Sequence, residues 1–302
     1  MEDKYGRPIT SLRISVTENC NLDCFYCHNE GCLEGNREMS TEEIVKLVEY
    51  ATDFGIEKVK YTGGEPLIRD DMVDIIERTS QFSLKDISLT TNGTELVSKA
   101  DGLEEAGLDR VNISLDTLDG EKYKKITGSS VLNKVKRGID SAINAGLTPV
   151  KLNTLLLDGI NEDEVEDLIN FSTERGAILQ LIELENVLPE NDSVYEKYHT
   201  DLDDIEERIQ DRTMDVRTRW LMQVRRKYIL EGGGEVEIVN PMHNSEFCSH
   251  CTRLRITSDG YLKPCLMRND NLVDVLSPLR EGDWSGVQDA YKEAVRRREP
   301  YY

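Results

Sequence analysis

The sequence predicts an α/β fold in which six strand–helix units form a partial (β/α)6 barrel of the TIM type. Runs rich in β-branched and apolar residues alternate with amphipathic segments up to about residue 185. Four glycines end helical patterns a few residues before the next strand, where glycine adopts the left-handed helix end at low cost. Parallel strands with right-handed crossovers account for this alternation better than an antiparallel sandwich does.

The predicted elements follow one another in regular order. The strands are Leu12–Thr17, Lys58–Thr62, Asp86–Thr91, Arg110–Leu115, Val150–Leu156 and Ile178–Leu184. The first helix begins at the capping box Ser40-Thr-Glu-Glu43, because the serine and the second glutamate can each satisfy a free backbone N–H. The other helices cover Asp70–Thr79, Glu95–Ala106, Val131–Ala145 and Glu162–Arg175, and the four helix-ending glycines are Gly55, Gly107, Gly146 and Gly176.

The pattern changes after residue 185. An acidic stretch runs through Asp215, and two hairpin strands, Trp220–Leu230 and Glu235–Asn240, flank three glycines at 232–234. A helix is expected to end the chain, through Arg298. We therefore expect two domains, residues 1–185 and residues 186–302.

Composition excludes several classes of function. The chain has 302 residues and a net charge of −21, from 37 basic and 58 acidic side chains, so nucleic acids and anionic membrane surfaces are repelled. Neither a signal peptide nor an apolar run of about 18 residues is present, which predicts a cytoplasmic protein. In that compartment seven cysteines are better explained as metal ligands or reactive thiols than as disulfides.

Three cysteines, Cys20, Cys24 and Cys27, form a C-x3-C-x2-C loop directly after the first predicted strand. Three thiolates can hold three irons of a [4Fe–4S] cluster and leave the fourth iron open, whereas structural sites generally use four protein ligands. In a parallel barrel, ligands gather at the carboxyl ends of the strands. The spacing therefore predicts a reactive cluster at the mouth of the barrel.

A second triplet, Cys248, Cys251 and Cys265, has the spacing C-x2-C-x13-C. By itself it fits zinc, an iron–sulfur cluster or structural thiols, and His250 or His243 could complete a zinc site. The seventh cysteine, Cys32, receives no role.

The first triplet resembles that of the radical S-adenosylmethionine (SAM) superfamily, with Tyr26 immediately before the last cysteine. A second superfamily element, Thr62-Gly-Gly-Glu-Pro66, follows the second predicted strand. In the superfamily this segment contacts the methionine part of SAM. Its glycines permit close backbone approach, and Glu65 could accept a hydrogen bond from the ammonium group of SAM.

The second triplet encloses Cys251-Thr-Arg-Leu-Arg255 and, with it, resembles the family of GTP 3′,8-cyclases of molybdenum-cofactor biosynthesis. The resemblance covers nearly the whole chain. It includes the strand motifs Ser11-Leu-Arg-Ile-Ser15, Thr90-Thr-Asn-Gly93, Asn112-Ile-Ser-Leu-Asp116, Ile126-Thr-Gly128, Val150-Lys-Leu-Asn153 and Ile182-Glu-Leu184.

This resemblance implies a radical SAM lyase with two [4Fe–4S] clusters, the first binding SAM and the second the guanine of GTP. It implies SAM contacts at Tyr26, Gly64 and Ser114, and GTP contacts at Arg13, Lys60, Thr90, Lys151, Arg253 and Arg255. A radical made from SAM would remove hydrogen from C3′ of GTP, and C3′ would then bond to C8 of guanine. On so acidic a chain a triphosphate can bind only where positive charges converge. The positive charge of five of these residues therefore suits GTP independently of the family resemblance.

The resemblance also implies partners: a reductant such as a flavodoxin or ferredoxin, and cyclic pyranopterin monophosphate synthase downstream. The sequence is silent on oligomeric state and leaves a homodimer open. Lys60 replaces a common arginine, Glu185 stands where methionine is common, and the chain lacks a Gly-Gly tail, for which an arginine in 296–298 could substitute. The rival interpretations are a radical SAM peptide-maturing enzyme and a non-catalytic metal-bearing sensor or scaffold.

Overall fold

Six neighbouring parallel strands form the centre of a twelve-stranded sheet in the computed structural model, which describes residues 1–31 and 37–302. These strands are β1 (Ser11–Ser15), β2 (Lys58–Thr62), β3 (Asp86–Thr91), β4 (Arg110–Ser114), β5 (Lys151–Leu155) and β6 (Ile178–Ile182). Each pairs in parallel with the next. The partial barrel predicted from the sequence is confirmed. Cys32 lies outside the described residues.

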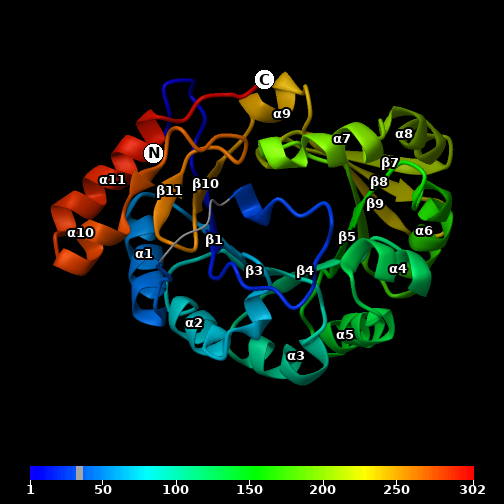
Figure 1. Ribbon diagram of the computed structural model, residues 1–302, viewed down its shortest axis with the longest axis horizontal. Coiled ribbons are helices and arrows are strands. Elements are labelled where there is room, and N and C mark those ends of the chain that lie inside the picture. Colours follow the sequence, from blue (N-terminus) through cyan, green and yellow to red (C-terminus); the bar gives the residue numbers. More distant parts are fainter. Residues whose placement is uncertain (32–36) are drawn as a thin grey trace.

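Helices surround the strands on the outside, as Figure 1 shows. The five predicted helices are present as α1 (Thr41–Asp53), α2 (Met72–Thr79), α3 (Leu96–Glu105), α5 (Leu132–Asn144) and α6 (Val165–Glu174). Ser40 caps α1 as expected. Its hydroxyl accepts a hydrogen bond from the backbone N–H of Glu43, and the Glu43 carboxylate accepts one from the backbone N–H of Ser40. Helix α4 (Gly120–Thr127) was not predicted. Ile126-Thr-Gly128, which we grouped with the strand motifs, is instead the end of this helix.

The C-terminal region begins with α7 (Asp192–Tyr198) and α8 (Asp203–Gln210), followed by the antiparallel strands β7 (Thr213–Arg219), β8 (Arg225–Leu230) and β9 (Glu235–Val239). The β8–β9 hairpin confirms the expectation. Strand β7 was not predicted and lies entirely before Trp220, and Trp220–Met222 is a 3-10 turn rather than strand. The expected terminal helix is two helices, α10 (Leu276–Glu281) and α11 (Trp284–Arg296).

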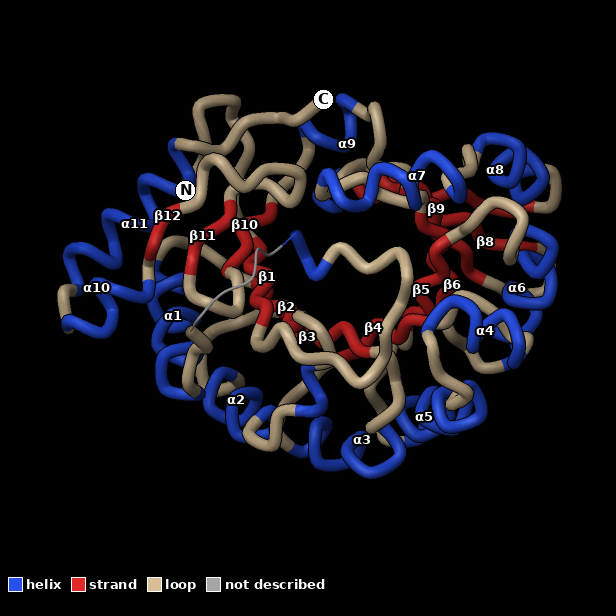
Figure 2. Tube along the Cα trace, viewed as in Figure 1, coloured by secondary structure: helices blue, strands red, loops and turns tan. Residues whose placement is uncertain are grey.

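The remaining elements are α9 (Ser245–Ser249), β10 (Arg253–Ile256), β11 (Tyr261–Lys263) and β12 (Val273–Asp274), and short 3-10 turns cover Asn29–Gly31, Pro66–Ile68, Glu162–Glu164 and Pro189–Asn191. Strand β10 pairs in parallel with β1, and β9 pairs in parallel with β6. Figure 2 shows the resulting arc of strands, open on the side of α9 and the C-terminus. The C-terminal region thus extends the barrel sheet at both edges.

Alternation along each strand sorts the side chains into two layers. On β1, Leu12 and Ile14 are fully buried in the apolar layer between sheet and helices. Arg13 therefore belongs to the opposite, inner face of the barrel. No helix among the described residues is both long and apolar enough to cross a membrane.

Candidate active site

The first cysteine loop follows β1 and is fastened to the far side of the barrel. The backbone N–H of Phe25 donates to the carbonyl of Ile126 at the end of α4 (3.1 Å). The hydroxyl of Tyr26 donates to Oδ2 of Asp116 (2.6 Å), which follows β4. Burial raises the pKa of Asp116 to about 6 and the pKa of Tyr26 well above its usual value. The tyrosine is therefore a neutral donor held in one orientation beside the cysteines.

The three thiols of this loop are free and influence one another. Burial raises the pKa of Cys20, Cys24 and Cys27, and negative charge on either of the other two thiols would raise that of Cys24 further. Among the residues described, no three His, Cys, Asp or Glu side chains are placed to share a single metal ion. In a [4Fe–4S] cluster each thiolate binds its own iron. Three neighbouring thiols at the carboxyl end of β1 fit such a cluster as ligands.

The Gly-Gly-Glu-Pro segment lies directly against the start of this loop. The N–H of Gly64 donates to the carbonyl of Thr17 (2.8 Å), and the N–H of Glu65 donates to that of Asn19 (2.8 Å). A Cβ atom at Gly64 would stand 2.1 Å from the carbonyl oxygen of Asn19. Only glycine permits this contact between the two backbones, so the segment sets the position of the residue before Cys20.

Glu65 is tied into the fold by its own hydrogen bonds. Its side chain is fully buried, and its oxygens accept hydrogen bonds from the N–H of Leu67 (3.0 Å), the hydroxyl of Thr91 (2.6 Å) and the N–H of Asn92 (2.6 Å). Burial raises its pKa to about 7. The carboxyl group joins the ends of β2 and β3, and its contact with the ammonium of SAM stays a prediction from the sequence.

Two predicted hydroxyl contacts lie on the inner face of the barrel. Ser114 ends β4, is partly exposed and stands two residues beyond Asn112 on the same face. The Thr90 hydroxyl on β3 is buried and has no hydrogen-bond partner within the described part of the chain. Buried donors without partners are rare and often mark the position of an absent ligand or water.

The predicted cations converge on the inner face, at matching levels of neighbouring strands. Arg13 on β1 stands opposite Arg255 on β10 and opposite Lys60 on β2. Arg253 lies two residues before Arg255 on the same face, and Lys151 stands on β5 opposite Asn112. Four strands from both halves of the chain thus carry one group of positive charges.

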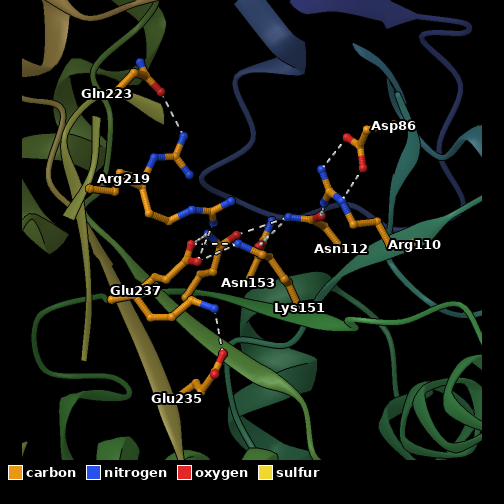
Figure 3. Close-up of polar contacts among 12 residues, drawn as sticks. Asp86, Arg110, Asn112, Lys151, Asn153, Arg219, Gln223, Glu235 and Glu237 are labelled. Carbon is orange, nitrogen blue, oxygen red and sulfur yellow. Dashed lines mark hydrogen bonds and ion pairs between the residues drawn. The ribbon is translucent and has the colours of Figure 1, made fainter. Parts of the chain in front are cut away.

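Lys60 is held by a neutral group. Its ammonium donates to Oδ1 of Asn112 (2.9 Å) and forms no ion pair with any described carboxylate. Burial lowers its pKa well below the usual value, and the nearby cations Arg110 and Arg13 lower it further. Arg110 itself donates to both oxygens of Asp86 (2.7 Å each), as Figure 3 shows.

Lys151, in contrast, is paired inside the protein. Its ammonium donates to both carboxylate oxygens of Glu237 (2.8 and 2.7 Å), and Arg219 donates to the same carboxylate (2.7 Å). Figure 3 shows both cations directed at Glu237. Burial would raise the pKa of Glu237, but Lys151 and Arg219 outweigh it and hold that pKa at about 2. Glu237 and Arg219 were not predicted, although alternation along β9 would have placed Glu237 inside.

Glu30, also not predicted, lies between two of the arginines. Its carboxylate accepts from Arg255 (2.7 Å), from Arg13 (3.2 Å) and from the hydroxyl of Thr62 (3.0 Å). Burial opposes its charge, yet Arg13 and Arg255 keep its pKa far below the usual range. One carboxylate is therefore shared by two guanidinium groups. Sequence alone could not show this contact, which joins positions far apart in the chain.

The second cysteine triplet is held by arginines from both ends of the chain. Arg7 donates to the carbonyl of Cys248 (2.9 Å) and Arg298 to the carbonyl of Cys251 (2.6 Å). Asp3 accepts from both arginines, at 2.7 and 3.0 Å. Burial alone would raise the pKa of Cys251, but the cations Arg253 and Arg298 lower it. A lowered pKa favours the thiolate, which is the form that binds metal.

The histidines near this triplet are directed elsewhere. Nδ1 of His250 is in hydrogen-bond contact with the carbonyl of Glu246 (3.0 Å), and the ring of His243 lies 4.9 Å from that of Tyr302. This arrangement gives no support to a zinc site. Of the C-terminal arginines, 296 and 297 pair with Glu293 at the surface, while Arg298 is buried as described above. Glu185 lies 3.7 Å from His28.

Solved structures share this fold at low sequence identity. SuiB of Streptococcus suis bound to the precursor peptide SuiA matches with a TM-score of 0.67 and 18% identity, over 88% of this chain and 62% of that one. Native anSMEcpe with bound AdoMet matches with a TM-score of 0.61 and 19% identity, over 94% and 80%. These likenesses concern the arrangement of the barrel.

Two family models match in succession. Residues 14–172 match the Radical SAM superfamily and residues 177–302 match Molybdenum Cofactor Synthesis C. With the cysteine loop on the barrel, they define the class: the chain belongs to the radical SAM superfamily. Relatives named "Probable GTP 3',8-cyclase" are 49% identical in Methanothermobacter thermautotrophicus and 52% identical in Pyrococcus abyssi, over at least 99% of both chains. Within the superfamily, the chain belongs to the GTP 3′,8-cyclase family.

Proposed function

We propose that this protein is the GTP 3′,8-cyclase of molybdenum-cofactor biosynthesis. It converts GTP to (8S)-3′,8-cyclo-7,8-dihydroguanosine 5′-triphosphate, the first step of the pathway. The observation that carries the proposal is the excess of buried positive charge inside the barrel.

This excess is large for so acidic a chain. Lys60, Arg225 and Arg253 form no ion pair with any described carboxylate, and Arg13 and Arg255 share Glu30 alone. Buried cations are costly unless they are paired. On a chain of net charge −21, a cluster of this kind is best explained by an anionic ligand of several charges. A nucleoside triphosphate supplies them.

The first site would hold the radical-generating cofactors. Cys20, Cys24 and Cys27 would bind a [4Fe–4S] cluster through three irons, leaving the fourth for SAM. When bound, this pair supplies the carbon radical that removes hydrogen from C3′ of the ribose. The chain would position SAM with Tyr26, Gly64 and Ser114. Tyr26 is suited to this because Asp116 fixes its hydroxyl, and Gly64 because it offers backbone alone.

The second site would hold the substrate. Arg13, Lys60, Thr90, Lys151, Arg253 and Arg255 are the proposed GTP contacts. Lys151 would use the one ammonium donor that Glu237 does not take. Cys248, Cys251 and Cys265 would hold a second [4Fe–4S] cluster, whose open iron binds guanine. Fixing both ends of the nucleotide would place C3′ and C8 for reaction, which is the main source of selectivity for a radical step.

Further parts of the assignment remain proposals. We propose that residues 1–185 carry SAM and the first cluster, and that residues 186–302 carry the second cluster and complete the GTP site. A flavodoxin or ferredoxin as reductant, cyclic pyranopterin monophosphate synthase as the next enzyme, a homodimer and a cytoplasmic location are also proposals.

The test is anaerobic incubation of the reconstituted protein with SAM, dithionite and GTP, followed by mass analysis of the products. Iron and sulfide counting should give about eight irons per chain for two clusters. Cys24→Ala should abolish SAM cleavage, whereas Cys251→Ala should abolish cyclisation and leave SAM cleavage intact. Full cyclisation by the Cys251 variant would contradict the two-cluster assignment, and a wild-type protein that consumes SAM without altering GTP would contradict the function.

The two arginines of the Thr-Arg-Leu-Arg segment allow a separate test. Replacing Arg253 and Arg255 together should reduce GTP turnover while the iron content is retained, because both side chains point into the barrel and neither binds iron. Unchanged GTP kinetics would remove them from the site.

A further inference from the structure

The turn between β7 and β8 brings one neutral side chain between two arginines of the barrel. Oε1 of Gln223 accepts hydrogen bonds from Nη2 of Arg225 (2.8 Å) and Nη2 of Arg253 (3.0 Å). Arg225 begins β8, and Arg253 begins β10. Gln223 is buried, with 8% of its surface exposed. A single amide oxygen thus joins strands from opposite ends of the sheet arc.

The backbone of this turn is strained. Gln223 has φ 64° and Val224 has φ 56°, so two successive residues other than glycine adopt the left-handed conformation. For a β-branched residue such as Val224 this is a true outlier. Such conformations persist only where the surroundings enforce them, and they concentrate at functional sites. The pairing of Arg219 with Arg225 closes this turn, and two charge-assisted hydrogen bonds to the Gln223 oxygen hold it from inside the barrel.

Cations inside the barrel are held in two different ways. Lys151 and Arg219 share the carboxylate of Glu237, which offsets one of their two positive charges, and Asp86 offsets the charge of Arg110. Lys60, by contrast, is held by the amide of Asn112, and Arg225 and Arg253 by the amide of Gln223. An amide oxygen orients a cation without neutralising it. In the second arrangement no internal carboxylate among the described residues pairs with the cation, so an incoming anion can supply the counter-charge.

Arg225 also keeps an unused donor. Its Nε is buried and has no hydrogen-bond partner among the described residues. Burial lowers the pKa of Arg225 to about 10, and the positive charges of Arg13 and Arg219 contribute to this. The side chain is therefore within electrostatic reach of the predicted phosphate contacts.

We propose that Arg225 is a further contact of the substrate's polyphosphate, and that Gln223 is the positioning residue that holds Arg225 and Arg253 toward it. This inference rests on the proposed function and adds the β7–β8 hairpin to the substrate site. It also assigns the reason for an amide at position 223: a carboxylate there would cancel one of the two charges that it orients.

Binding measurements on the reconstituted full-length protein test this under anaerobic conditions, with GTP, tripolyphosphate and SAM as separate ligands. Gln223→Glu keeps the shape of the side chain and adds one negative charge, and Arg225→Met removes the cation. Each variant should weaken the binding of GTP and of tripolyphosphate about tenfold or more, with SAM affinity and iron content kept. Gln288→Glu, at an exposed position of α11, is the matched charge control and should bind all three ligands as the wild type does.

The outcomes separate the inference from the function. Wild-type affinity for GTP and tripolyphosphate in both variants would overturn the inference and leave the proposed function standing. An equal loss in Gln288→Glu would overturn it too, because the effect would be one of net charge. Parallel losses of SAM, iron and GTP in both variants would show a purely structural role. If the wild-type protein neither bound GTP nor converted it, the proposed function itself would be contradicted.

Discussion

Replacing Lys151 by methionine would separate the structural role of this lysine from its role in binding substrate. The Lys151 and Glu237 side chains are exposed by only 5% and 0%, and the ammonium donates to both carboxylate oxygens. Methionine keeps most of the volume and removes the charge. Glu237 would then retain Arg219 and the amide of Gln180 as partners.

The magnitude follows from these contacts. Removing one partner of a buried ion pair destabilises a protein by about 3–5 kcal/mol. Because Arg219 still faces Glu237, we expect the lower end for Lys151→Met, about 3 kcal/mol. Glu237→Gln leaves two cations with an amide and should cost about 4–5 kcal/mol. The double variant should lose less than the sum of the two single losses.

The loss of folding stability at low pH provides an independent measure of the Lys151–Glu237 ion pair. Burial disfavours the Glu237 carboxylate, but the surrounding cations lower its pKa from 4.5 to about 2. A carboxyl group with a lowered pKa adds stability that is present above the unfolded value and is lost as pH falls toward the folded one. Glu237 should therefore contribute about 3 kcal/mol above pH 4.5, lost between about pH 4.5 and 2. The Glu237→Gln variant should lack this contribution.

Anaerobic urea unfolding, followed by circular dichroism at a series of pH values, measures both effects. The reasoning would be refuted if Lys151→Met were as stable as the wild type at pH 7. If that variant kept its stability but lost GTP affinity, Lys151 would be a substrate ligand without a structural role. GTP binding to the same samples completes the comparison.

Three further changes have defined outcomes. Glu30→Gln removes the carboxylate shared by two arginines and should tighten GTP binding about tenfold by calorimetry; weaker binding would count against phosphate contacts there. Arg298→Met removes the donor to the Cys251 carbonyl and should lower the iron content by about half, through the second cluster alone; unchanged iron and stability would contradict this. Gly64→Ala should lose the first cluster because its Cβ meets backbone, whereas Gly102→Ala, inside helix α3 with nothing within 4 Å, should keep it; equal iron in both would contradict the argument.

The six barrel strands could be predicted because each is a short buried run with its own local pattern. Strand β7 was missed because five of its seven residues are exposed and its apolar alternation is limited to Met214 and Val216. Helix α4 was missed for a related reason: only three of its eight residues are buried, so its apolar face is narrow. The spacing of apolar residues in the sequence reveals elements that bury an apolar face, so elements that bury few side chains are hard to predict.

The residues of the candidate site also divide into those that the sequence could predict and those that it could not. Alternation places Arg13 and Lys60 inside the barrel, so their convergence was foreseeable from the strands alone. The partners of these cations were not, because Glu30 meets Arg255 across 225 positions of sequence. Glu65 shows a role that the motif did not reveal: the sequence predicted a contact with SAM, and the structure adds burial and three internal hydrogen bonds that join the ends of β2 and β3.

The pairing of β10 with β1 has a consequence for the order of assembly. Strand β1 is among the first segments to be synthesised, yet one of its two neighbours, β10, is separated from it by more than two hundred residues. Closing so long a loop is slow, and until it closes one edge of β1 lacks its partner. Arg253 and Arg255 arrive with that strand. A chain that stops before residue 252 would contain the first cysteine loop without these two arginines, so the part proposed to bind SAM is encoded before the arginines proposed to bind GTP.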